Sequence, residues 1–211
     1  RISNQDQCRF RNCVQFWLME KIRLCFATNN SHKLDEVRAM LPSEFEILSL
    51  RDIECSDELP ENQRTIEGNA LEKARYIFDK FGIDCFADDT GLEVESLGGE
   101  PGVDTAHYAG PERDADKNMA LLLTNLEGKS NRNARFKTVF SLFWQGEMYH
   151  FEGVVPGTIG MQKKGDQGFG YDPVFIPDGF TQTFAELGTD IKNRLSHRAA
   201  ATRQLAAFLA G

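Results

Sequence analysis

The first part of the chain alternates between apolar runs and stretches in which apolar residues recur at helical spacing. Residues 22–27 form an apolar run of strand length, and a polar loop follows. Apolar side chains then recur every three or four positions over 34–41. This pattern predicts a strand, a loop and a helix that Asn30 or Ser31 can cap and that Pro42 ends.

The central stretch begins with the apolar run 85–87 and finishes with 92–95, where apolar and acidic residues alternate. Between them lie Asp88, Asp89, a threonine and a glycine. We therefore expect a buried strand, a sharp bend and a half-exposed strand. Successive strand residues face opposite sides, so without the bend only one of the two acids can enter a given pocket. The alternative is a solvated turn, since these residue types favour turns.

The rest of the chain predicts further elements on each side of this stretch. They are a strand at 46–50, a helix that follows Thr65, a helix at 114–126, a hairpin of 134–144 with 147–155, and an alanine-rich helix that follows Ser196. The hairpin would turn at Gln145-Gly146 and bury Phe136, Phe140, Leu142 and Trp144. We interpret the hairpin as scaffold.

Lys33 falls in the first turn of the first predicted helix. The helix dipole disfavours a cation there, but free backbone N–H groups and a lysine together form a good cradle for an anion. This placement suggests a phosphate site, and the alternative is an exposed lysine tolerated at a small electrostatic cost. The chain contains neither a Walker A sequence nor a dinucleotide-binding glycine fingerprint.

Two later loops carry candidate chemistry. Glu61 lies in a polar, acid-rich loop and could reach a metal ion shared with Asp89, although most loop glutamates are merely solvated. The segment 165–173 combines glycines with Phe169, Tyr171 and an acid. Such a loop suits a flat aromatic ligand, unless its rings fill the core instead.

Lys192, His197 and Arg198 cluster around the predicted start of the last helix. They form the second group of basic residues at a helix start in a protein whose formal net charge is −8. We interpret two such groups in an acidic chain as the site of a small polyanionic ligand.

The composition narrows the class of protein. With 211 residues, 41% hydrophobic and 27% charged, the chain fits one globular domain, and its negative charge argues against a nucleic-acid partner. The five cysteines form no CxxC pair, which predicts neither a disulfide framework nor a zinc site and favours a reducing, cytoplasmic compartment. No apolar run is long enough to cross a membrane.

Residues 1–18 lack a periodic pattern, and the first methionine is Met19. We expect 1–18 to be a dispensable N-terminal extension and 19–211 to form a single domain.

Five motifs occur in order between residue 22 and the end of the chain. They are Ala-Thr-Asn-Asn-x-x-Lys (27–33), Ala-Asp-Asp-Thr-Gly-Leu (87–92), Gly-Gly-x-Pro-Gly (98–102), Gly-Phe-Gly-Tyr-Asp-Pro (168–173) and Ser-His-Arg (196–198). Together they closely resemble the Ham1-like inosine triphosphate pyrophosphatase family. The resemblance implies a two-lobed α/β fold: a long mixed β-sheet flanked by helices, with a cleft between the lobes. It also implies Mg²⁺, a homodimer, and hydrolysis of dITP, ITP and XTP to the monophosphate and pyrophosphate.

The resemblance further implies roles for individual residues. Asp89 would be the catalytic acid, and Glu61 and Asp89 would bind the metal. The implied substrate contacts are Thr28, Asn29, Asn30, Ser31, His32 and Lys33 for the triphosphate, Thr90, and, for base and phosphates, Phe169, Gly170, Tyr171, Asp172, Lys192, His197 and Arg198. Many relatives have glycine at the position of Asn29, serine at that of Thr90 and arginine near that of His107.

Two other functions compete with this one. Asp89-Thr90-Gly91 is also the active triplet of aspartic proteases, but Asp88 and Leu92 do not fit the residues that normally flank that triplet. A nucleotide-sensing module that binds without hydrolysis would carry the same residues, and the release of pyrophosphate distinguishes it from an enzyme.

Overall fold

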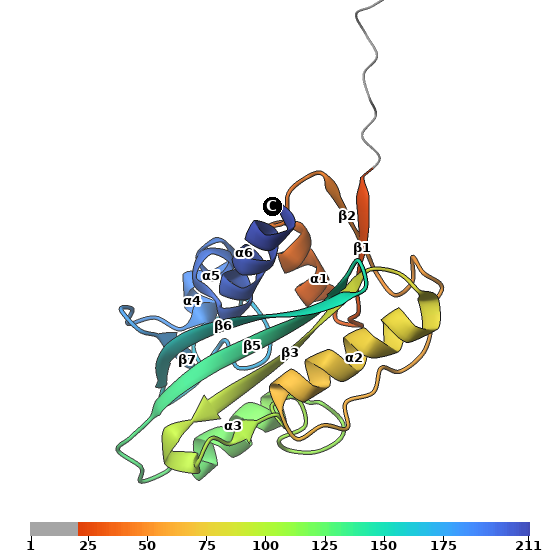
Figure 1. Ribbon diagram of the computed structural model, residues 1–211. Coiled ribbons are helices and arrows are strands. Elements are labelled where there is room, and N and C mark those ends of the chain that lie inside the picture. Colours follow the sequence, from red (N-terminus) through yellow and green to blue (C-terminus); the bar gives the residue numbers. More distant parts are fainter. Residues whose placement is uncertain (1–20) are drawn as a thin grey trace, which may run out of the picture.

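The computed structural model describes residues 21–211, which build a mixed β-sheet flanked by helices (Figure 1). The strand order is β2-β1-β3-β5-β6-β7, and β4 pairs with β3 outside this path. Strands β2, β1 and β3 are parallel, whereas the later pairs are antiparallel. The strands are β1 (Ile22–Phe26), β2 (Phe45–Leu48), β3 (Cys85–Val94), β4 (Pro101–Gly102), β5 (Asn133–Trp144), β6 (Glu147–Ile159) and β7 (Phe175–Pro177).

Helices cover the sheet from both sides, as Figure 1 shows. Phe86 packs with α1 and α6 on one side, while its neighbours Cys85 and Ala87 pack under α2 on the other. This arrangement follows from the alternation of side chains along β3. The helices are α1 (Ser31–Arg38), α2 (Ile66–Phe81), α3 (Ala115–Asn125), α4 (Phe184–Leu187), α5 (Thr189–Leu195) and α6 (His197–Leu209), with a 3₁₀ turn, η1 (Glu95–Leu97).

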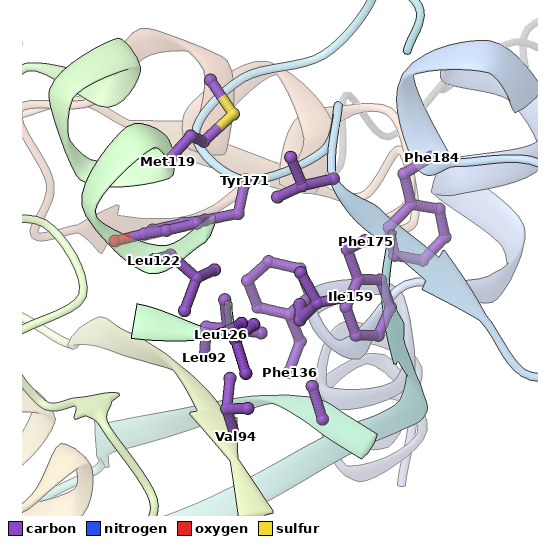
Figure 2. Close-up of a cluster of buried hydrophobic side chains, with 12 residues drawn as sticks. Leu92, Val94, Met119, Leu122, Leu126, Phe136, Ile159, Tyr171, Phe175 and Phe184 are labelled. Carbon is purple, nitrogen blue, oxygen red and sulfur yellow. The ribbon is translucent and has the colours of Figure 1, made fainter. Parts of the chain in front are cut away.

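A separate core forms the second lobe, where α3 and the last strands pack against the far end of β3. Leu92, Met119, Phe136, Tyr171 and Phe175 meet there (Figure 2). Strands β3 and β5 run through both lobes, so the long antiparallel pair fixes how the lobes face one another. The two-lobed α/β fold that the resemblance implied is confirmed.

The sharp bend expected after residue 87 is wrong. Strand β3 pairs with β5 without interruption from Cys85 to Val94, because the ladder holds the turn-prone residues in an extended conformation. Gly91 serves close packing rather than a bend: a Cβ there would lie 2.6 Å from Ile66 Cδ1 and 2.7 Å from the Gly102 oxygen.

Most other predicted elements are confirmed, with shifts at their ends. Thr65, Asp114 and Ser196 each cap the helix that follows, and the hairpin turns between Trp144 and Glu147. Helix α1 ends at Arg38 rather than at residue 41, and the Met40 N–H bonds the Val37 oxygen three residues back, which tightens the last turn.

No described helix is long and apolar enough to span a bilayer. The predicted extension 1–18 lies outside the residues that the structure describes.

Candidate active site

A cleft of about 690 Å³ lies between the two lobes. Residues 27–33, the middle of β3 and residues 192–198 contribute to its wall, so segments that are far apart in the sequence meet there. The lining contains every residue for which the sequence predicted a role: Thr28, Asn29, Asn30, Ser31, His32, Lys33, Glu61, Asp89, Thr90, Phe169, Gly170, Tyr171, Asp172, Lys192, His197 and Arg198.

Asp88 faces the α1 and α6 side of β3 and is almost completely buried. Lys33 Nζ donates to its Oδ1 at 3.0 Å, and Arg198 Nη2 lies 3.4 Å from its Oδ2. Burial alone would raise the pKa of Asp88, but the two cations hold that pKa well below the usual range of an aspartate. Asp88 is therefore a fixed negative charge beneath the cleft.

Asp89 faces the opposite side of β3, toward α2. Asn69 Nδ2 donates to its Oδ2 at 3.3 Å, and Lys73 Nζ lies 3.6 Å from its Oδ1. Burial raises the pKa of Asp89 above that of an ordinary aspartate, although Lys73 opposes the shift. A carboxylate with a raised pKa that lines a cleft is a candidate for proton transfer.

Lys73 also joins Asp89 to Glu61. Its Nζ lies 2.5 Å from Glu61 Oε1, and Arg113 Nη2 lies 3.2 Å from Glu61 Oε2. Burial works against the charge of Glu61, but these two cations lower its pKa. Glu61 and Asp89 thus share one ammonium partner. Among the described residues, no three histidine, cysteine or acidic side chains gather as a ready metal site.

The start of α1 differs from the predicted cradle of free N–H groups. The Asn30 side chain caps the helix and accepts from the N–H groups of His32 and Lys33, so these two donors are already satisfied. The Lys33 ammonium likewise has a partner in Asp88. Any anion here would meet a lysine whose position is fixed by a buried acid.

The two aromatic residues of the glycine-rich loop behave differently. Tyr171 belongs to the core of the second lobe, as the alternative interpretation expected, and its hydroxyl donates to the Thr105 carbonyl. Phe169 remains partly exposed in the cleft, where His32 stacks on it with a centroid distance of 5.4 Å. Asp172 accepts from the backbone N–H of Phe169 at 2.7 Å and so fixes the loop that carries the ring.

Three cations and three acids meet where α1, α5 and α6 converge, and we call them the cation network: Lys33, Lys192, Arg198, Glu36, Asp88 and Asp172. Lys192 Nζ lies 2.7 Å from Asp172 and 3.1 Å from Glu36. Arg198 bonds Glu36 and Asp88. The predicted basic cluster is confirmed as a cluster, but acids balance it.

His197 stacks on Phe136 with a centroid distance of 4.6 Å. Burial and the nearby Arg198 and Lys192 lower the pKa of His197 well below its ordinary value, so its ring is neutral. Within residues 21–211, its Nδ1 and the Nε of Arg198 have no hydrogen-bond partner. Phe136 also lines the cleft, so the hairpin is more than the scaffold we expected.

A model described as the Ham1 family matches residues 24–208. The chain belongs to the Ham1 family. It is 52% identical over 184 residues to the dITP/XTP pyrophosphatase of Flavobacterium johnsoniae, which covers 87% of this chain and 96% of the relative. It is 50% identical over 192 residues to the dITP/XTP pyrophosphatase of Porphyromonas gingivalis, with 90% and 98% covered.

Solved structures of Ham1 proteins have the same fold. The Ham1 protein of Staphylococcus aureus matches with a TM-score of 0.83 and 34% identity, over 90% of this chain and 98% of that one. The HAM1 protein of Coxiella burnetii matches with a TM-score of 0.84 and 32% identity over the same shares. Family membership removes support for the aspartic protease interpretation, and Asp89-Thr90-Gly91 lies within an unbroken strand.

In this Ham1-family chain, the sequence reasoning missed Asn69, Lys73 and Glu36. Asn69 and Lys73 are four residues apart on α2, next to the buried Ala70 and Ala74. Polar residues within the apolar stripe of a helix are a signal that could have identified them. Glu36 gave no such signal, because the helix periodicity alone does not reveal its partners on α5 and α6.

Proposed function

We propose that this protein hydrolyses the non-canonical purine nucleoside triphosphates dITP, ITP and XTP to the monophosphate and pyrophosphate. The observation that carries the proposal is the single cleft in which a buried carboxylate of raised pKa meets a group of cations. Relatives half identical to this chain and named dITP/XTP pyrophosphatase support it.

Asp89 is the general base in this proposal. It takes a proton from a water molecule as the water oxygen forms a bond to the α-phosphorus. The bond between that phosphorus and the bridging oxygen then breaks, and pyrophosphate leaves with the bonding electrons. Asn69 and Lys73 hold the Asp89 carboxylate, and Lys73 keeps it from rotating away from the reacting water.

Lys33 and the loop that precedes it bind the triphosphate. The Lys33 ammonium is fixed at 3.0 Å from Asp88, so it is already oriented when substrate arrives. Thr90 lies beside this pair, where its hydroxyl bonds Thr138 at 2.7 Å. Positive charge close to the leaving pyrophosphate stabilises the negative charge that develops on it.

Base recognition falls to Phe169, His197 and Arg198. Phe169 is partly exposed in the cleft, and a purine can stack on its ring in place of His32. Arg198 can only donate hydrogen bonds, which favours the O6 acceptor of a 6-oxo purine over the amino group of adenine. The Nε of Arg198 and the Nδ1 of the neutral His197, which are buried and have no partner among the described residues, are the polar atoms to which we assign this discrimination.

The donors at Asp89 and Glu61 fit Mg²⁺, which prefers carboxylate and phosphate oxygens and commonly binds through one or two carboxylates. A bound Mg²⁺ would neutralise phosphate charge. The ammonium of Lys73 contacts both carboxylates and so fixes their spacing.

The proposal extends to a cytoplasmic homodimer. The three cysteines of the described part, Cys25, Cys55 and Cys85, are free thiols, which fits a reducing compartment. The dimer rests on family resemblance alone, and the mass of the purified protein by light scattering tests it. A monomeric mass at working concentration would overturn that part.

One assay tests the activity itself. ITP, dITP, XTP, ATP and GTP are each incubated with the protein, with and without Mg²⁺, and released pyrophosphate is measured. We expect ITP, dITP and XTP to release pyrophosphate with a higher kcat/KM than ATP, in the presence of Mg²⁺, while GTP tests whether recognition extends beyond O6. Release of single phosphates, or equal kcat/KM for ATP and ITP, would contradict the proposal, and tight binding without release would favour a sensing module.

A further inference from the structure

Glu36 is placed to hold two cations at once. It lies on α1, three residues after Lys33, and its side chain is only 12% exposed. One carboxylate oxygen, Oε1, lies 3.1 Å from Lys192 Nζ, and the other, Oε2, bonds Arg198 Nη1. Its two oxygens are therefore divided between α5 and α6. Neither the triphosphate loop nor the base contacts proposed above include this residue.

Glu36 also closes a ring of charged contacts. Lys33 bonds Asp88 on β3, Asp88 bonds Arg198 on α6, and Arg198 returns to α1 through Glu36. Because Lys33 and Glu36 lie on one face of the same helix, the ring braces α1 against β3 and α6. A charged group in such a ring loses rotational freedom, since every turn away from one partner breaks a buried bond.

The two cations that Glu36 holds are those next to the Phe169 ring. Lys192 Nζ lies 4.1 Å from the ring centroid, and Arg198 Cζ lies 5.7 Å from it. We propose that Glu36 is a positioning residue that sets discrimination between 6-oxo and 6-amino purines by fixing Lys192 and Arg198 at the base site. This inference rests on the proposed function.

Each cation keeps a second acid when Glu36 is lost. Lys192 retains Asp172 at 2.7 Å, and Arg198 retains Asp88 at 3.4 Å. Loss of the Glu36 charge thus leaves no cation without a counter-charge, and the fold should survive. The guanidinium, however, is then held from one side only. It can turn toward Asp88, away from the position in which it donates to O6.

The test compares Glu36→Gln with Asp35→Asn, which removes one negative charge from the adjacent, exposed position of α1. We measure kcat and KM for ITP and for ATP. For Glu36→Gln we expect the ratio of kcat/KM for ITP over ATP to fall roughly tenfold, chiefly through KM for ITP. Asp35→Asn should keep the wild-type ratio. A ratio unchanged in Glu36→Gln, or lowered equally in both variants, would overturn the inference.

A melting curve accompanies each variant, so that a loss of fold is recognised. If Glu36→Gln does not fold, Glu36→Asp replaces it: this variant keeps the charge but withdraws the carboxylate by one methylene, and an unchanged ratio would again overturn the inference.

The proposed function is judged separately on the wild type. If wild type releases no pyrophosphate, that function fails, and equilibrium binding of ITP and ATP to wild type and variant then decides the inference. If wild type and variant bind ITP over ATP with equal selectivity, or if neither nucleotide binds, the inference is overturned.

Discussion

Asp88 and Asp89 are neighbours in the chain, yet they have different partners on opposite sides of the sheet. On the α1 and α6 side, Asp88 contacts two cations, and its pKa lies well below the ordinary value. On the α2 side, Asp89 contacts an amide and one lysine that it shares with Glu61, and burial raises its pKa. The strand alternation alone separates the two environments.

The difference shows how one strand can supply two kinds of carboxylate. Two titratable groups whose surroundings push their pKa values apart take different roles in many active sites. Asp88 is a permanent counter-charge that organises the cation network, whereas the raised pKa of Asp89 makes it the acid that exchanges a proton more readily. In the proposed function, the cleft thus has a charge-balanced side that would bind the triphosphate and a side that would carry out proton transfer.

Asp89→Asn removes the proposed proton acceptor on the α2 side of β3. The amide keeps the size and one acceptor oxygen but cannot take a proton, so we expect kcat for ITP to fall about 10²- to 10⁴-fold with KM nearly unchanged. Steady-state pyrophosphate release measures both. Near-normal turnover would remove Asp89 from the mechanism, and a large rise in KM would make it a binding residue instead.

Asp88→Asn removes a negative charge from the α1 and α6 side of β3, and we expect its main effect to be a lower free energy of unfolding. It leaves the buried Arg198 and the largely buried Lys33 without part of their counter-charge, which costs about 3 kcal/mol of unfolding free energy when a buried pair loses one partner. Urea denaturation measures this loss. Asp89→Asn is the matched variant on the other face of the strand, and an equal loss in both variants would refute the distinction.

The sequence predicted most of the elements because their ends carry local signals. Asp114 and Ser196 cap helices through their own side chains, and the hairpin needs only the Gln-Gly turn between alternating residues. The bend after residue 87 failed for a non-local reason. Aspartate, threonine and glycine favour turns, but pairing with the whole length of β5 outweighs that preference.

The site could be predicted only in part. Motifs identified residues on the cleft wall, but nothing local indicated that Glu36, Asp88 and Asp172 neutralise the cations. Those contacts depend on where α1, β3 and α6 meet, which spacing along the chain does not encode. The sequence therefore suggested an excess of positive charge where the structure has a balanced network.

The pH dependence of stability should have opposite signs for the two acids. Asp88 has a folded pKa below its unfolded value of about 3.9, so its stabilising contribution is present above that value and is lost as pH falls through the folded pKa. Asp89 has a raised folded pKa, so stability falls as pH rises from the unfolded to the folded pKa.

Urea midpoints over this range, for wild type and both asparagine variants, separate the two contributions. We expect Asp88→Asn to reduce the loss on the acid side and Asp89→Asn to reduce the decline above it, since Glu36, Glu61 and Asp172 keep their own shifted pKa values. Wild-type kcat should also fall as pH drops through the raised pKa of Asp89. A decline as steep in Asp89→Asn as in wild type would show that another group causes it.

Arg113 lies at the rim of the cleft, where we expect a substitution to change the free energy of unfolding least. Its contact with Glu61 is half exposed, with 53% of the arginine side chain accessible, so the pair contributes about 1 kcal/mol or less. Its backbone is also strained, with φ at 54°. Arg113→Ala loses the pair and keeps the strain, whereas Arg113→Gly loses both and should be the more stable by about 1 kcal/mol.

Urea unfolding of both Arg113 variants measures which of them is the more stable. An alanine variant as stable as the glycine variant would mean that the strain carries no cost, and a loss well above 1 kcal/mol in both would mean that the rim pair matters as much as the buried ones.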